Sequence, residues 1–169
     1  MDNKRIYDNY AFISYKSEDE KWAEWIKRKL EGYKLPTILK KTNPSLPRHL
    51  RPIFRDKTDL GGGILSDELE KQLQSSEFLI VICSPHASRS EWVNKEIQVF
   101  IDEGRLGNII PFIVEGLPHA GSAVEECFPQ ALKNIPKDKE LLGINVQEIG
   151  KERAFIKVIA RMLWFRFDS

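Results

Sequence analysis

A tryptophan and a glutamate four residues apart, Trp92 and Glu96, have types and a spacing that suit chemistry at a cleft. In a helix, residues four apart lie on one face. An indole there can stack on a base or pyridine ring, while the adjacent carboxylate can stabilise developing positive charge. The alternative is structural: Trp92 covers the edge of the core and Glu96 is solvated, as most helical glutamates are. The residue pattern alone favours this second interpretation.

The histidines and cysteines give weaker indications of a catalytic or metal site. His49, His86 and His119 share no spacing that suits a metal site or the base of a nucleophile, so we expect them to be structural or solvated. Cys83 lies inside an apolar run and is predicted to be a core residue. Cys127 is the only other cysteine in the sequence. Two such cysteines indicate reduced thiols in the cytoplasm rather than a disulfide framework.

A glycine-rich loop, Gly61–Gly63, precedes a predicted helix and could hold a phosphate. It lacks the Lys-Ser or Lys-Thr that completes a phosphate-binding loop. We therefore interpret it as a mobile loop that gates a cleft or pairs with another subunit. Arg55 and Asp56 before it are predicted to form an ion pair that holds the loop.

The elements that position these residues alternate along the chain. Apolar, β-branched or aromatic composition predicts strands over residues 10–15, 51–56, 78–83, 109–114 and 143–146. Apolar residues at helical spacing predict helices around the stripes 22–30, 65–73, 93–101 and 155–164. The apolar face of the last of these helices is predicted to consist of Phe155, Ile159, Met162 and Trp164.

Several local features follow from single residues. Asp19 or Ser17 is predicted to cap the first helix, and residues 33–50 to form a long irregular connection. Ser88 to Glu91 fits a capping box that opens the third helix. Pro111 predicts an edge position or a bulge for the fourth strand.

Strands alternating with helices predict the α/β class, specifically a flavodoxin-like three-layer sandwich with a central parallel sheet of about five strands and helices on both faces. In such sheets ligands lie beyond the carboxyl ends of the strands, where the strand order reverses. A flavodoxin-like order places that crevice between the first and third strands. It selects residues 14–17 and 84–90 as its walls.

Composition limits the class of protein. With 169 residues the chain is expected to form one domain, 1–169, that buries a core without disulfides or metal. Hydrophobic residues at 41% and charged residues at 30% exclude a disordered, collagenous or coiled-coil chain. The apolar runs are too short to cross a bilayer and no secretory signal is visible, so a cytoplasmic protein without membrane partners is expected. The net charge of +1 hides a basic segment, residues 27–57, that carries +8 and leaves −7 for the remainder.

Together these residues resemble a TIR (Toll/interleukin-1 receptor) domain of the bacterial type, in its NAD⁺-cleaving branch. The first family box resembles residues 10–15 with Asp19, and the second resembles Arg55-Asp56 with Leu60 and Gly61–Gly63. Residues 84–96 resemble the signature of the third helix. The third box, a Phe-Trp pair, is matched only loosely by Trp164-Phe165 in reversed order.

The resemblance implies an enzyme that releases nicotinamide from NAD⁺ and forms ADP-ribose or a cyclic isomer, in bacterial signalling or antiphage defence. The family's catalytic glutamate corresponds to Glu96, and the tryptophan that lines its cleft to Trp92. The implied substrate contacts come from the loops after the first and second strands: Ser14, Tyr15, Lys16, Ser17, Leu60, Gly61 and Gly62.

One carboxylate is enough for this chemistry. Glycosidases use two because an acid must protonate the leaving alkoxide, whereas nicotinamide leaves NAD⁺ as a neutral molecule. What remains is to stabilise an oxocarbenium-like ribose, which a carboxylate can do electrostatically. NAD⁺ is then the substrate, and no cofactor or metal is expected.

Two other classes of function stay open. The first is a non-catalytic adaptor that binds other TIR domains, although glycines stand where receptor-type domains carry proline in the second loop. The second is nucleic-acid binding through residues 27–57, which is not expected because regularly interleaved aromatic residues are lacking. The resemblance also implies activation by self-association into homo-oligomers. It allows that the chain is an excerpt of a longer protein with a C-terminal sensor or effector region.

Overall fold

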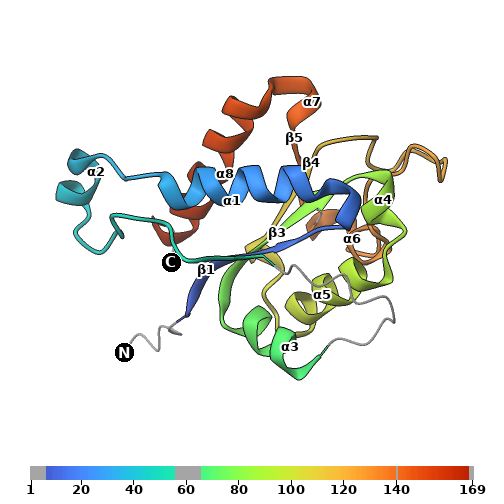
Figure 1. Cartoon of the computed structure of the whole chain (residues 1–169), viewed down its shortest axis with the longest axis horizontal. Coiled ribbons are helices and arrows are strands. Elements are labelled where there is room, and N and C mark those ends of the chain that lie inside the picture. The colour runs from blue at the N-terminus through green and yellow to red at the C-terminus, as the bar shows by residue number, and fades with distance from the viewer. Residues whose placement is uncertain (1–6, 56–65, 140, 168–169) are drawn as a thin grey trace.

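A computed structural model describes residues 7–55, 66–139 and 141–167, with side chains as far as Trp164. Its centre is a five-stranded parallel sheet with the order β2-β1-β3-β4-β5 (Figure 1). The strands are β1 (Asn9–Ser14), β2 (Ile53–Arg55), β3 (Ser76–Cys83), β4 (Ile109–Ile113) and β5 (Ile144–Asn145). This order is the flavodoxin-like one, so the predicted fold class is confirmed.

Helices cover both faces of the sheet, which gives three layers (Figure 1). They are α1 (Glu20–Gly32), α2 (Thr37–Thr42), α3 (Asp67–Gln74), α4 (Pro85–Ser88), α5 (Glu91–Asp102), α6 (Gln130–Lys133), α7 (Val146–Ile149) and α8 (Lys151–Phe167). Helices α1 and α8 pack on one face, and α3, α5 and α6 pack on the other. The described part of the chain has no helix both long and apolar enough to cross a membrane.

The alternation of side chains along each strand builds two cores. The α1-side core includes Ala11, Ile13, Ile80, Phe112 and Val158, and the α5-side core includes Phe12, Leu79, Val81, Ile97 and Phe100. Strand β3 contributes to both, because successive side chains point to opposite faces. Its unbroken apolar run is therefore the one predicted for a strand covered on both sides.

The helix caps differ from the predicted ones. Asp19 holds the N-cap position of α1, but its side chain makes no capping hydrogen bond, because the carboxylate binds Ser84 instead. At α5 the cap is Ser90, whose Oγ accepts a hydrogen bond from the Val93 amide at 3.2 Å. Ser88 ends the short helix α4 and so cannot open α5. The predicted capping box is wrong by two residues.

Three further predictions are corrected. The connection 33–50 contains the helix α2, with the Thr42 hydroxyl bonded to the Ile38 carbonyl. Strand β4 lies between β3 and β5 and is not an edge strand. Pro111 is tolerated because β5 is only two residues long and pairs with Phe112 and Ile113 alone. Trp164 is 69% exposed, and Met162 and Leu163 fill the core from that end of α8.

Candidate active site

A serine and a glutamate meet at the point where the strand order reverses. Strand β1 ends at Ser14, and β3, its neighbour in the sheet, leads through α4 into α5 with Glu96. The Ser14 hydroxyl donates a hydrogen bond to Glu96 Oε1 at 2.7 Å. Both side chains are buried, with relative exposures of 0% and 1%. The strand ends between which a crevice was predicted thus carry a buried carboxylate on the α5 side.

The burial of Glu96 contradicts the solvated position that its sequence pattern alone favours. Helix α5 turns Val93, Ile97 and Phe100 into the α5-side core, and Glu96 lies within the same buried arc. An ionised carboxylate loses hydration on burial and is rarely buried without partners. Glu96 is therefore not the solvated helical glutamate that the pattern alone favours, and its position must be held by specific contacts such as that from Ser14.

Trp92 lies one turn before Glu96 on the same helix. It is half-buried and packs against the α5-side core. Its spacing gives it the same face of α5 as Glu96. The indole therefore covers the edge of the core, as the structural interpretation predicts, and keeps part of its surface exposed.

The other predicted residues of the first loop, Tyr15, Lys16 and Ser17, lie in different environments. Tyr15 packs against the α1-side core, on the opposite face of the sheet from α5, because it is the next residue after Ser14. The Tyr15 hydroxyl accepts a hydrogen bond from Arg55 Nη1 at 3.3 Å. Lys16 is half-buried, and Ser17 is exposed and donates to Glu18 Oε1 at 2.8 Å. Among the four predicted loop residues, Ser14 makes a side-chain hydrogen bond to Glu96.

The second predicted loop falls outside the described residues, and with it Leu60, Gly61, Gly62 and Asp56. Arg55, just before it, forms an ion pair with Glu20 of α1 at 3.2 Å. Burial lowers the pKa of Arg55, but the bonds to Glu20 and Tyr15 outweigh it and raise the pKa above its ordinary value. Arg55 therefore joins β2 to α1, which is a structural role.

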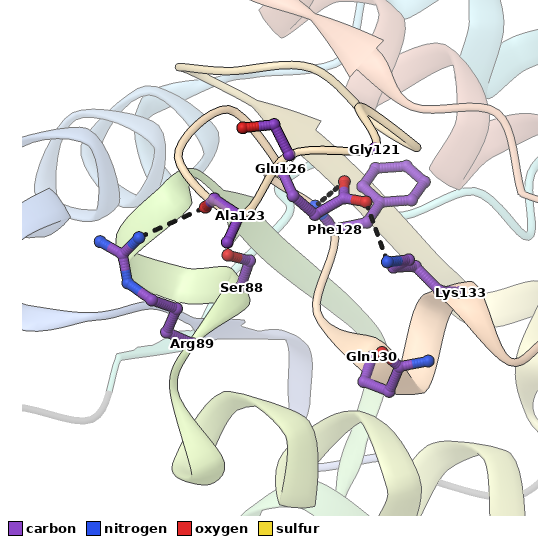
Figure 2. A pocket seen from close by; sticks show the side chains of 9 residues that line it. Ser88, Arg89, Gly121, Ala123, Glu126, Phe128, Gln130 and Lys133 are labelled. Atoms are coloured by element: carbon purple, nitrogen blue, oxygen red, sulfur yellow. Dashed lines mark hydrogen bonds and ion pairs between the residues drawn. The ribbon is translucent and has the colours of Figure 1, made fainter.

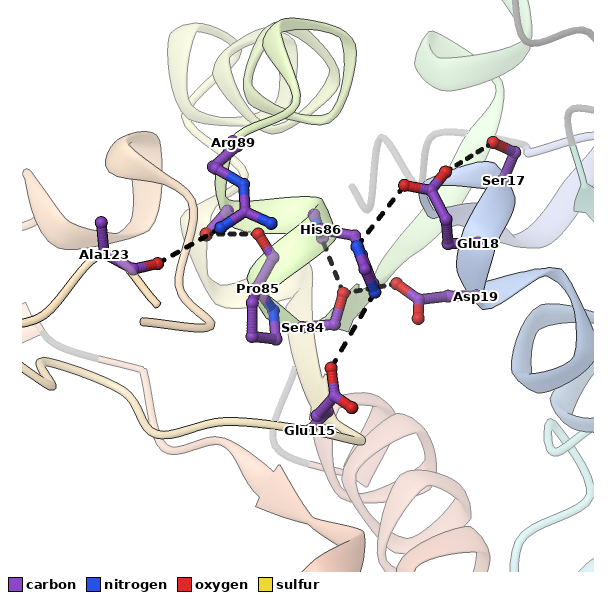
Figure 3. Close-up of polar contacts among 11 residues, drawn as sticks. Ser17, Glu18, Asp19, Ser84, Pro85, His86, Arg89, Glu115 and Ala123 are labelled. Carbon is purple, nitrogen blue, oxygen red and sulfur yellow. Dashed lines mark hydrogen bonds and ion pairs between the residues drawn. The ribbon is translucent and has the colours of Figure 1, made fainter. Parts of the chain in front are cut away.

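A second serine–carboxylate pair lies at the same edge of the sheet (Figure 3). The Ser84 hydroxyl, directly after β3, donates to Asp19 Oδ2, and Ser84 Oγ also accepts the amide of Ala87 at 3.1 Å. Exposures of 0% for Ser84 and 7% for Asp19 show that the pair is buried. Sequence reasoning missed this contact, although it placed Ser84 beside the crevice, because the two residues are 65 positions apart.

An exposed set of ionisable groups adjoins this pair. His86 Nδ1 lies 3.4 Å from Glu18 Oε2, and its Nε2 lies 4.0 Å from Glu115 Oε2 (Figure 3). The hydrogen bond from Ser17 is the main cause that lowers the pKa of Glu18. These contacts join the segments after β1, β3 and β4, but exposed pairs of this kind stabilise a fold little. Within the described residues, no group of three or more His, Cys, Asp or Glu is arranged to hold a metal ion.

A hollow of about 370 Å³ lies between the end of α4, residues 121–128 and α6 (Figure 2). Glu126 is its buried carboxylate and receives hydrogen bonds from the amides of His119 and Phe128 and an ion pair from Lys133. Burial raises the pKa of Glu126, but the bonds from Phe128 and Lys133 prevail and lower it. Ser88 and Arg89, from the predicted crevice wall 84–90, line this hollow, whereas Ser14, Trp92 and Glu96 do not.

The basic segment does not form a free cationic surface throughout. Lys27 pairs with Glu31 at 3.1 Å, Lys29 with Glu152 at 3.2 Å, and Arg55 with Glu20. Glu31 belongs to the segment and is already counted in the +8, whereas Glu152 and Glu20 lie outside it and neutralise part of that charge locally.

Comparison with known proteins gives the family context. A family model described as "TIR domain" matches residues 11–139. The chain is 34% identical over 71 residues to a curated protein of Actinoplanes sp. named NAD(+) hydrolase ApTIR, a match that covers 41% of this chain and 10% of that protein. Among solved structures it is similar to the TIR domains of the activated Roq1 resistosome, with 21% identity, a TM-score of 0.44, and coverage of 63% of this chain and 57% of the other.

Proposed function

This chain belongs to the TIR domain family, and on that premise we propose that it cleaves NAD⁺ and releases nicotinamide. The observation that carries the proposal is the buried Glu96 carboxylate, bonded to Ser14 at the carboxyl ends of β1 and β3. The similarity over 71 residues to a protein named as an NAD(+) hydrolase supports the same activity.

In the proposed reaction the bond between the ribose C1′ and the nicotinamide nitrogen breaks, and its electron pair leaves with nicotinamide. The ring nitrogen of NAD⁺ is already cationic, so nicotinamide departs neutral and needs no acid. The positive charge moves to the ribose as an oxocarbenium-like centre. Water then adds to C1′ and loses a proton to give ADP-ribose, or a nucleophile of the same molecule adds to give a cyclic isomer.

Glu96 acts in this scheme as the fixed negative charge opposite the developing cation. A carboxylate enclosed by protein interacts with that cation more strongly than one in water would, because the surrounding dielectric is lower. Ser14 holds Oε1 by its hydrogen bond, so the carboxylate does not have to reorient during the reaction. Trp92, half-buried one turn earlier, is proposed to form the wall against which the nicotinamide or ribose packs.

We further propose that association between copies of the chain completes the crevice. The loop that contains Leu60, Gly61 and Gly62 and the exposed Ser17 would then take part in substrate contacts or in contacts between subunits.

The test is to incubate concentrated protein with NAD⁺ and separate all products by chromatography. Wild-type protein is expected to release nicotinamide together with ADP-ribose or a cyclic isomer, and Glu96→Ala to lose this activity while its circular dichroism spectrum is unchanged. Glu91→Ala is the matched control, because Glu91 is an exposed glutamate of the same helix. Absence of nicotinamide release by wild-type protein at any concentration would favour the adaptor function instead.

A further inference from the structure

The two serine–carboxylate pairs are reciprocal. Ser14, at the end of β1, donates to Glu96 on the helix that follows β3. Ser84, directly after β3, donates to Asp19 at the start of the helix that follows β1. Since β1 and β3 are neighbours in the sheet, each strand end is bonded to the segment that the other strand leads into. Glu96 serves the proposed reaction, whereas Asp19 has no role in it so far.

Asp19 is unusual for a residue at the start of a helix. A carboxylate there ordinarily caps the first turn by accepting a backbone amide, but Asp19 makes no such bond. Asp19 is 7% exposed, and its carboxylate is directed to Ser84. The cap that α1 forgoes and the hydration that Asp19 loses are both costs. The hydrogen bond from Ser84 is the contact that Asp19 makes in place of the helix cap and of hydration.

The contact fixes a short segment. The Asp19 amide donates to the Lys16 carbonyl at 2.7 Å and closes the turn Ser17–Asp19, so the position of Asp19 sets the path of the chain from Ser14 to α1. On the other side, Ser84 also caps α4 through the Ala87 amide. The Asp19–Ser84 bond thus ties the segment after β1 to the segment after β3, on the α1 side of the crevice.

We propose that Asp19 is a positioning residue, which holds the segment Tyr15–Glu18 against Ser84 and so sets the affinity of the crevice for its substrate. The inference rests on the proposed function, because the substrate is NAD⁺. The Asp19 carboxylate is directed to Ser84, so its effect on the substrate passes through the backbone of this segment. The ion pair between Glu18 and His86 also joins the segment after β1 to the segment after β3, but it is exposed to solvent.

The test compares Asp19→Ala, Asp19→Asn and Ser84→Ala with wild-type protein in steady-state cleavage of NAD⁺. Asp19→Ala removes the acceptor and is expected to raise KM at least about tenfold, the range for losing one buried charged hydrogen bond, while kcat stays within about threefold. Asp19→Asn keeps an acceptor oxygen for the Ser84 hydroxyl and is expected to recover most of the affinity. Ser84→Ala should resemble Asp19→Ala. Glu115→Gln is the control: it alters an exposed carboxylate of the same cluster and should leave both constants unchanged.

Two results would overturn the inference. One is a KM that Asp19→Ala leaves unchanged. The other is a loss of kcat alone, which would place Asp19 in the chemistry. Amide hydrogen exchange is measured on the same variants, and exchange over residues 15–19 should accelerate at least about tenfold in Asp19→Ala, as expected when one such bond is lost.

The exchange measurement also separates the two proposals. Faster exchange in Asp19→Ala together with no cleavage by wild-type protein would contradict the proposed function and leave the tie between the two segments supported. Cleavage by wild-type protein with unchanged exchange and unchanged KM would contradict the positioning role alone.

Discussion

Replacing Ser14 by alanine tests how the structure holds the proposed catalytic carboxylate. The substitution removes the hydroxyl that donates to Glu96 Oε1 at 2.7 Å in a site where both side chains are buried. A hydrogen bond to a charged group contributes about 1.5–3 kcal/mol. If this bond keeps Glu96 in the geometry that the transition state needs, its loss corresponds to a decrease of about 10- to 150-fold in kcat.

The matched control is Ser76→Ala. Ser76 is equally buried but lies at the first residue of β3, the end of that strand away from the crevice. Its hydroxyl donates to the Gln72 carbonyl at 2.7 Å and accepts from Asn9 Nδ2 at 3.3 Å. Both variants therefore lose a buried hydroxyl, and both are expected to unfold at lower denaturant concentration, but only one loses a contact to Glu96.

The assay is nicotinamide release under saturating NAD⁺, with urea unfolding monitored in parallel. We expect kcat to fall in Ser14→Ala and to stay within about twofold of wild type in Ser76→Ala, as for a residue that acts on stability alone. A Ser14→Ala variant with wild-type kcat would refute the argument that this hydrogen bond positions Glu96. An equal fall in both variants would show that general destabilisation explains the loss.

Three further predictions follow from other parts of the molecule. Burial raises the pKa of Asp19 above its ordinary 3.8, so its contribution to stability is present below that value and is lost as the pH rises through the higher folded-state pKa. The free energy of unfolding of Asp19→Asn relative to that of wild type, measured in urea, should accordingly be higher at pH 7 than at pH 4. A difference between the two proteins that does not change with pH would contradict this. Ser90→Ala removes the cap of α5 and should lower the free energy of unfolding by about 1 kcal/mol, whereas an unchanged midpoint of unfolding would mean that the bond to Val93 contributes nothing. If association completes the crevice, the rate of nicotinamide release should rise more steeply than in proportion to protein concentration, and strict proportionality from dilute protein upward would contradict assembly.

The layers of the fold were predictable because their signals are local and repetitive. The apolar run that became β3 and the helical stripe of α5 each repeat one pattern over two or more turns or pleats. Features set by one or two residues were harder to predict. Ser88 and Ser90 both suit a cap, and only the insertion of α4 decides between them. Pro111 signals an edge, but the short β5 lets it lie inside the sheet.

For the candidate site, the neighbouring strand ends were predictable from the sequence and the contacts between them were not. Alternation along parallel strands directs attention to the ends of β1 and β3, where Ser14 and Ser84 lie. The burial of Glu96 could not be derived from its helical position, which is offset by one residue from the apolar stripe of Val93 and Ile97. The bond between Asp19 and Ser84 joins residues that only the folded sheet brings together.

The most direct test of the proposed function is the rate of nicotinamide release by Glu96→Gln relative to wild-type protein at the same high concentration. Glutamine keeps the size of the side chain and an oxygen that can accept from Ser14, and it removes the negative charge. We expect a rate at least about 100-fold lower, the range for removing one preorganised electrostatic contact in an active site. A Glu96→Gln protein that releases nicotinamide as fast as wild type would contradict the proposed function.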